Sequence, residues 1–190
     1  MVPGRPGRWH AGGVHELIAL LLPGGDDFVA AVQRAWAAGD AVLPLDPGAP
    51  AAHLDQVVAA LAPTAVVEAD GEVRSLPGGR PVDDGDALVI ATSGTTGTPK
   101  GAVHTHDSIE HAAFATSVAT GVAADTWWLA CLPLSHVGGF SVVSRALLTG
   151  ARLEVHPRAD ATAIDDAAAR GATHVSLVPT LLTRIDPARW

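Results

Sequence analysis

The chain of 190 residues is long enough for one ordinary domain or two small subdomains. Its formal net charge is −8, so no basic patch supplies the phosphate contacts that non-specific binding to nucleic acids or membrane surfaces needs. The single cysteine, Cys131, excludes an internal disulfide framework and favours a reducing compartment. No apolar run approaches the roughly 20 residues of a membrane helix. We therefore expect a cytoplasmic protein with a sizeable apolar core, because 48% of its residues are hydrophobic.

The first part of the chain alternates between helical and strand patterns. Apolar residues recur at helical spacing after Asp26, the predicted N-cap, and Gly39 ends this helix. Pro50 opens a second helix, and the pair Asp70-Gly71 predicts a hairpin turn. The remaining expectations are an irregular segment at 1–15, strands at 41–45, 64–69 and 72–76, and a linker at 77–86.

The alternation resumes after the linker. Asp107 is the predicted N-cap of a helix, with Glu110 completing a capping box. Strand and helix alternate throughout, which predicts an α/β fold with a largely parallel sheet and right-handed crossovers. The pattern also suggests two units, an N-terminal subdomain at 1–86 and a second subdomain at 87–190. The expected strands here are 87–92, 102–105, 127–132, 152–156 and 173–178, and the further helices are 138–149 and 162–170.

A loop rich in glycine and hydroxyl groups follows the apolar strand at 87–92. Its glycines let the backbone approach a ligand closely, and its amides and hydroxyls can donate to phosphate oxygens. A lysine adds a point charge suited to phosphate. The spacing is that of neither a Walker A motif nor a dinucleotide-binding fingerprint, and a mobile surface loop rich in turn formers fits the composition equally well. The candidate phosphate ligands are Thr92, Ser93, Gly94, Thr95, Thr96, Gly97 and Lys100.

The loop sequence "TSGTTGTPKG" resembles the phosphate-loop signature of the adenylate-forming superfamily. The segments 31–50, 132–140 and 175–185 are similar to other parts of the large N-terminal domain of these enzymes. The resemblance implies that the loop holds the β- and γ-phosphates of Mg-ATP. It also implies that a carboxylate is activated as acyl-AMP, with release of pyrophosphate, and is then transferred to the thiol of CoA. Donors placed around the departing pyrophosphate would stabilise the transition state electrostatically.

Within that superfamily, residues 128–151 are most similar to the o-succinylbenzoate–CoA ligase family of menaquinone biosynthesis. The distinguishing residue is Arg145, nine positions after His136 in an otherwise apolar helix. o-Succinylbenzoate has two carboxylates, and an arginine in the acyl pocket could hold the one that is not activated by a bidentate pair. Alternatively, Arg145 lies on the solvent face of its helix or pairs with an acidic neighbour.

Three other features allow both a functional and a purely structural interpretation. The resemblance implies a gating or acyl-contact role for His136, whereas a satisfied core or loop histidine is the alternative. His104 and neighbouring histidines do not match the ligand spacing of a zinc site, so we expect no metal site in the chain. Trp127 and Trp128 are expected to be core and surface partners of a strand, not a stacking platform for a ligand.

Several segments of the superfamily have no counterpart in these 190 residues. They are the Tyr-Gly-x-Thr-Glu segment near adenine, the aspartate of the ribose site and the late catalytic lysine. One hypothesis is therefore the N-terminal portion of a CoA ligase, without turnover by itself. The other is a non-catalytic phosphate- or acyl-binding module, either a degenerate relative or one half of a split enzyme. If strands 127–132 and 173–178 normally pair with later segments of the superfamily, open sheet edges and an apolar face remain here, and we expect self-association into a homo-oligomer.

Overall fold

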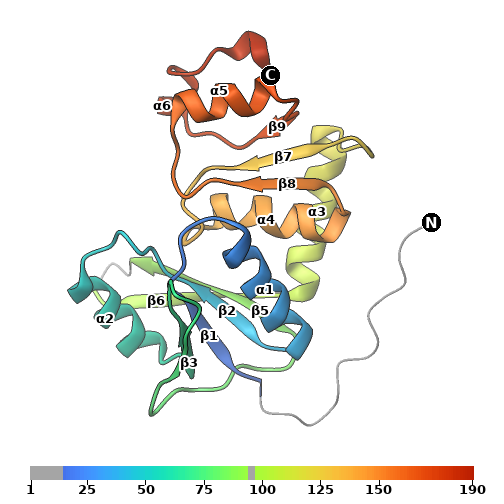
Figure 1. The fold of residues 1–190 in the computed structure, drawn as a ribbon. Helices are drawn as coiled ribbons and strands as arrows, with labels where there is room; N and C mark the ends of the chain where they lie inside the picture. Colours follow the sequence, from blue (N-terminus) through green and yellow to red (C-terminus); the bar gives the residue numbers. More distant parts are fainter. Residues whose placement is uncertain (1–14, 94–96) are drawn as a thin grey trace.

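The computed structural model describes residues 15–93 and 97–190 as a layered α/β structure (Figure 1). The larger sheet has six strands in the order β4-β3-β1-β2-β5-β6. β1, β2, β3 and β5 run parallel, whereas β4 and β6 each pair antiparallel with the preceding strand. The strands are β1 (Leu17–Leu20), β2 (Ala41–Pro44), β3 (Ala65–Val67), β4 (Val73–Ser75), β5 (Asp86–Ser93) and β6 (Pro99–Thr105).

The smaller sheet has three parallel strands in the order β8-β7-β9. They are β7 (Trp127–Ala130), β8 (Arg152–Val155) and β9 (His174–Val175). The helices are α1 (Asp26–Ala38), α2 (Ala51–Leu61), α3 (His106–Thr120), α4 (Val137–Thr149), α5 (Ala161–Ala169) and the single turn α6 (Pro179–Leu182), followed by a 3₁₀ turn at Pro187–Arg189. The α/β class and the largely parallel pairing are confirmed.

The two sheets stack with α1, α3 and α4 between them (Figure 1). A central apolar cluster joins Leu88 of β5, Phe28 of α1, Trp128 of β7 and Phe140 of α4, and this cluster is the main core. α2 covers the outer face of the six-stranded sheet, and α5 covers the outer face of the three-stranded sheet. Helix α4 is therefore enclosed by both sheets, which explains why its residues are buried on nearly every side.

The strand assignments need two corrections. The strand expected at 173–178 is only two residues long, His174–Val175, because it pairs with β7 over that short stretch alone. β7 itself is the central strand of its sheet, so it does not provide the open edge that the sequence suggested. β6 and β9 do lie at sheet edges, and self-association through such edges stays a prediction. The proposed boundary at 86/87 also stays a prediction, although β5, which begins at Asp86, pairs with β2.

Two helix starts also differ from expectation. Asp26 is the first residue of α1 rather than its N-cap, a position held by Gly25. The N-cap of α3 is Thr105 instead of Asp107, and the Thr105 hydroxyl accepts a hydrogen bond from the Ser108 amide. The predicted capping box with Glu110 is therefore wrong, because the helix begins two residues earlier.

No helix in the described part of the chain is long and apolar enough to cross a membrane.

The capping assignment predicts a difference between two substitutions at the start of α3. Thr105→Ala removes the hydrogen bond to the Ser108 amide and should lower the free energy of unfolding by about 1 kcal/mol. Asp107→Ala removes only a favourable charge in the first turn and should cost about 0.5 kcal/mol. Urea denaturation of the two variants measures both values, and a larger loss in Asp107→Ala would show that Asp107 is the cap after all.

Candidate functional site

The phosphate-loop sequence connects β5 to β6 in the structure. β5 ends at Ser93, β6 begins at Pro99, and Thr92 pairs with Lys100 across the hairpin. The Thr92 hydroxyl donates to the Lys100 carbonyl at 3.1 Å, which fixes the base of the loop. Gly97 has φ +81°, a left-handed conformation that favours glycine. Gly94, Thr95 and Thr96 lie outside the described residues.

The side chains of Thr92, Ser93 and Lys100 are exposed at the end of this hairpin. Their exposure suits contact with a ligand, and Lys100 is the single lysine of the whole sequence. The loop's cation and two of its hydroxyls therefore lie at the carboxyl end of a strand in a largely parallel sheet, and their role as phosphate ligands stays a prediction. Ligands bind at such ends in open α/β sheets.

One face of the β5–β6 hairpin extends from the phosphate loop to a pocket. Side chains alternate between the two faces of a strand, so Lys100 and His104 share one face of β6. His104 pairs with Leu88, which packs into the central cluster on the side of α3 and α4. At about 3.4 Å per residue, the four residue steps from Lys100 to His104 span about 14 Å. One face of the hairpin thus connects the phosphate loop with the space between the hairpin and α4.

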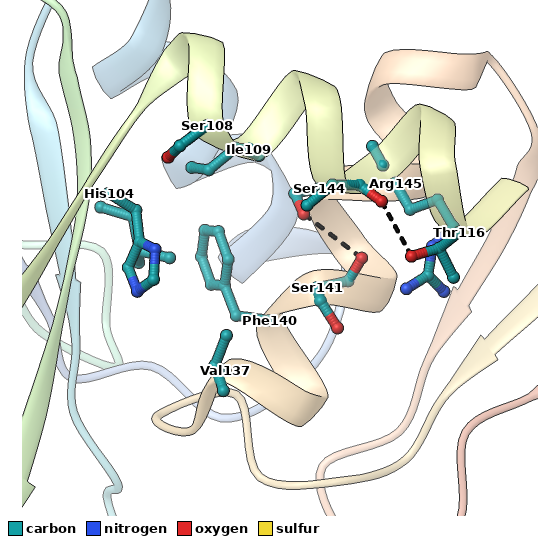
Figure 2. Close-up of a pocket in the computed structure, with 12 residues that line it drawn as sticks. His104, Ser108, Ile109, Thr116, Val137, Phe140, Ser141, Ser144 and Arg145 are labelled. Atoms are coloured by element: carbon teal, nitrogen blue, oxygen red, sulfur yellow. Dashed lines mark hydrogen bonds between the residues drawn. The ribbon is translucent and has the colours of Figure 1, made fainter.

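That space is a pocket of about 220 Å³ between β5–β6, α3 and α4 (Figure 2). In Figure 2 the imidazole of His104 lies at one end, the guanidinium of Arg145 at the other, and the ring of Phe140 between them. Apolar side chains from all three elements make up most of the remaining wall. The lining residues are Leu88, His104, Ser108, Ile109, Ala112, Ala113, Thr116, Val137, Phe140, Ser141, Ser144 and Arg145.

Arg145 is buried, with only 6% of its surface exposed. Its guanidinium carbon lies 4.6 Å from the ring centroid of Trp128, and its Nε has no hydrogen-bond partner among the described residues. None of the ion pairs formed within residues 15–93 and 97–190 includes Arg145. Burial lowers its pKa from the usual value, because the charged form has lost water without gaining an acidic partner. The structure thus contradicts both the solvent-exposed and the acid-paired alternatives for this residue.

The hydroxyl groups of the pocket are engaged by their own helices. Ser144 donates to the Ser141 carbonyl at 3.2 Å, and Thr116 donates to the Ala112 carbonyl at 2.8 Å. Ser108 likewise donates to the Thr105 carbonyl. Because these protons are directed to the backbone, the guanidinium is the strongest donor that the lining residues offer to a ligand. A buried cation in an apolar pocket recognises an anion, and its planar fork matches the geometry of a carboxylate or a phosphate.

His136 lies elsewhere. It is the exposed N-cap residue of α4, and its side chain makes no capping hydrogen bond. It lines a second pocket of about 120 Å³ with Asp46, His53 and Ala91, near the ends of β2 and β5. The structure therefore does not bring His136 and Arg145 into one pocket. The predicted gating or acyl-contact role of His136 stays a prediction.

Trp128 and His104 belong to this arrangement, but neither was predicted from the sequence as a site residue. Trp127 and Trp128 are both buried, and Trp128 provides the ring against which Arg145 stacks, so neither is a surface residue. His104 was considered only as a metal ligand, whereas it lines the pocket. The alternation of β6 could have revealed His104, since it shares a face with Lys100. Nothing in the sequence indicates that Trp128 and Arg145 meet.

Comparisons with known proteins find a matching family and relatives of this chain. The AMP-binding enzyme family matches residues 75–188. The 2-succinylbenzoate–CoA ligases of Bacillus mycoides (strain KBAB4) and Bacillus cereus (strain Q1) are each 41% identical to this chain over 96 residues, 50% of the chain and 20% of the ligase. The matched segment thus spans only a fifth of these curated relatives.

Solved structures give the same fold. O-succinylbenzoate coenzyme A synthetase (MenE) from Bacillus subtilis, in complex with AMP, has a TM-score of 0.76 and 21% identity, and the match covers 88% of this chain and 50% of that one. A variant of E. coli MenE with bound OSB-AMS has a TM-score of 0.72 and 26% identity, over 90% and 40% of the two chains. ATP-bound MatB from Rhodopseudomonas palustris has a TM-score of 0.74 and 22% identity, over 93% and 42%. Because the family profile matches more than half of the sequence, the chain belongs to the AMP-binding enzyme family.

Proposed function

We propose that this chain forms the ATP-phosphate and acid-recognition part of an AMP-forming acid–CoA ligase that acts on o-succinylbenzoate. The observation that carries the proposal is the buried, unpaired Arg145 in a pocket on the same hairpin face as the phosphate loop. The ring carboxylate of o-succinylbenzoate would pair with Arg145, and its aliphatic carboxylate would extend towards the loop. A fatty acid would leave the guanidinium without a partner, which is costly in an apolar pocket.

In the proposed reaction, the aliphatic carboxylate attacks the α-phosphate of ATP, the bond to the β-phosphate breaks, and pyrophosphate leaves. The hydroxyl of Ser93 and the ammonium of Lys100 would stabilise the charge that develops on the leaving group, while the Thr92 hydroxyl holds the base of the loop through its bond to the Lys100 carbonyl. The acyl-AMP would then react with the thiol of CoA, giving the thioester and AMP. Each charge-assisted hydrogen bond is worth about 1.5–3 kcal/mol.

Mg²⁺ is usually held by one or two carboxylates together with substrate phosphates. No group of three or more potential metal ligands occurs within residues 15–93 and 97–190. The described residues thus offer no all-protein cage for Mg²⁺, and we derive no step through the metal. Any Mg²⁺ at the loop would arrive as the complex with ATP.

The adenine, ribose and catalytic-lysine segments of the superfamily have no counterpart in the sequence, so we propose that the chain alone binds its ligands without turnover. Mass spectrometry after incubation with Mg-ATP and o-succinylbenzoate tests this part. We expect no acyl-AMP, and its formation would overturn the claim. A non-catalytic binding module gives the same result in this assay. Adding the separately expressed C-terminal part of a related ligase separates a ligase portion, or one half of a split enzyme, from a degenerate relative, because a degenerate relative predicts no restored acyl-AMP formation.

The phosphate-loop assignment predicts that ATP protects Lys100. Because Lys100 is the only lysine, reductive methylation of the chain labels just two amines, Lys100 and the α-amino group. Saturating ATP should slow labelling of Lys100 and leave the α-amino group unchanged. Lys100→Ala should weaken ATP binding by about 10-fold or more, the loss of one charge-assisted contact. Arg74→Ala, which removes an exposed cation on β4, is the control and should leave ATP binding unchanged. Equal labelling with and without ATP would contradict the assignment.

A further inference from the structure

The contact between Arg145 and Trp128 combines two buried side chains of opposite character. Trp128 has 3% of its surface exposed, and its ring lies 4.6 Å from the guanidinium carbon. It points from β7 towards α4, whereas the preceding Trp127 packs in the cluster on the other face of the sheet. The guanidinium therefore contacts an aromatic face where a buried arginine would more often contact a carboxylate.

The indole is itself held in place from the neighbouring strand. Its ring contacts the imidazole of His174 at a centroid distance of 4.8 Å. His174 Nε2 lies 3.0 Å from the Thr120 carbonyl, and its Nδ1 lies 2.8 Å from the Thr173 hydroxyl. The imidazole can donate to the carbonyl and accept from the hydroxyl, so both contacts are satisfied together. β9 and the end of α3 thus fix the ring that supports Arg145.

An aromatic face and a carboxylate would support Arg145 with different consequences. A carboxylate partner would occupy the N–H groups at the guanidinium edge and neutralise its charge. An indole attracts the cation through the face of its ring and leaves the N–H groups at the edge of the guanidinium available. Among the described residues Nε is buried without a partner, whereas the terminal nitrogens are not among the buried unpartnered atoms, so they form the edge that Arg145 presents to the pocket. A cation held in this way is prepared to bind a carboxylate bidentately.

We infer that Trp128 is a positioning residue that determines specificity for a second carboxylate on the acid substrate, acting through Arg145. This inference rests on the proposed function, in which Arg145 takes the ring carboxylate of o-succinylbenzoate. It extends that proposal by assigning discrimination between di- and monocarboxylic acids to a residue outside the pocket lining. Loss of the indole should therefore weaken binding of the diacid specifically, because a monoacid makes no use of the guanidinium.

The test measures the affinities of o-succinylbenzoate and of 4-oxo-4-phenylbutanoate, which lacks the ring carboxylate, by isothermal titration with the full chain. The ratio of the two dissociation constants is compared in the parent chain, Trp128→Leu, Trp128→Phe, Arg145→Met and the double variant Trp128→Leu/Arg145→Met. Trp127→Leu is the matched control, because Trp127 is equally buried but faces the other side of the sheet. Circular dichroism checks that each variant is folded. If Trp128→Leu does not fold, Trp128→Phe takes its place in the comparison.

We expect Trp128→Leu to reduce the preference for the diacid by about 10-fold, and Trp128→Phe to reduce it less, because a phenyl ring is the weaker cation–π partner. Neither Trp127→Leu nor the addition of Trp128→Leu to Arg145→Met should change the preference. If Arg145→Met abolishes the preference and the Trp128 variants retain it, the inference fails while the proposed function stands. A Trp128 effect that persists in the Arg145→Met background overturns the inference as well. If Arg145→Met itself leaves the preference intact, the proposed function fails.

Discussion

Replacing Gly139 by alanine is expected to lower the free energy of unfolding by about 3 kcal/mol, near the upper end of the usual cost of overpacking. A Cβ at this position would lie 2.3 Å from the Pro133 carbonyl oxygen and 2.6 Å from that of Leu132. Both atoms belong to the backbone, so neither can move aside as the end of a flexible side chain could. The first turn of α4 would have to separate from the segment that follows β7.

The adjacent glycine provides a matched control. A Cβ at Gly138 would meet only Leu132 Cδ1, at an ordinary contact distance of 3.9 Å. Gly138→Ala should therefore be neutral or stabilising by up to about 1 kcal/mol, because alanine loses less conformational freedom in a helix than glycine does. Thermal unfolding of the two variants should show melting temperatures that differ by roughly 6–16 °C for a chain of this size. Equal melting temperatures would contradict the close approach of α4 to residues 132–133.

Replacing Arg145 by methionine is expected to weaken binding of o-succinylbenzoate by about 10- to 150-fold, the loss of a charge-assisted hydrogen bond. Binding of 4-oxo-4-phenylbutanoate should be unchanged, since that acid has no second carboxylate. The substitution should not destabilise the fold and should slightly stabilise it, because methionine fills a similar volume and removes a buried charge without an acidic partner. Loss of binding with retained or raised stability distinguishes a ligand-binding arginine from a structural one.

Arg152→Met is the control for this prediction. The Arg152 guanidinium also stacks on an indole, 3.4 Å from the ring centroid of Trp127, but Arg152 is exposed and does not line the pocket. Its replacement should leave the affinities for both acids unchanged. Isothermal titration and thermal unfolding of the two variants make the comparison. If Arg145→Met weakens binding of both acids equally, or if Arg152→Met also weakens binding of o-succinylbenzoate, Arg145 does not recognise the second carboxylate.

Local signals in the sequence were sufficient to predict much of the fold. Gly39 and Gly150 end their helices in the left-handed conformation, as expected for glycine at that position, and the turn at Asp70-Gly71 joins the antiparallel pair β3–β4. Features that depend on tertiary pairing were predicted less well. The strand expected at 173–178 pairs with β7 over two residues only, and the choice between Thr105 and Asp107 as N-cap depends on where β6 ends.

The candidate site, too, could be predicted only where its residues are contiguous in the chain. The loop from Thr92 to Lys100 could be identified because its chemistry is contiguous in the chain. The pocket could not, because β6, α3 and α4 each contribute to it. α4 lies between two sheets, so its burial has no amphipathic period that would reveal which way Arg145 points. His136 and Arg145 are close in sequence on the same helix, and only the structure shows that they line different pockets.

The most direct test of the central claim is the NMR signal of the Arg145 Nε–H group in the ¹⁵N-labelled chain. This group is buried and lacks a partner among the described residues, and its cross-peak is identified by its disappearance in Arg145→Met. If the pocket binds the second carboxylate of the acid, saturating o-succinylbenzoate should shift the Nε–H resonance, because the carboxylate pairs with the guanidinium of which Nε is part, and 4-oxo-4-phenylbutanoate should not. An Arg145 cross-peak that stays in place at saturating o-succinylbenzoate would contradict the claim.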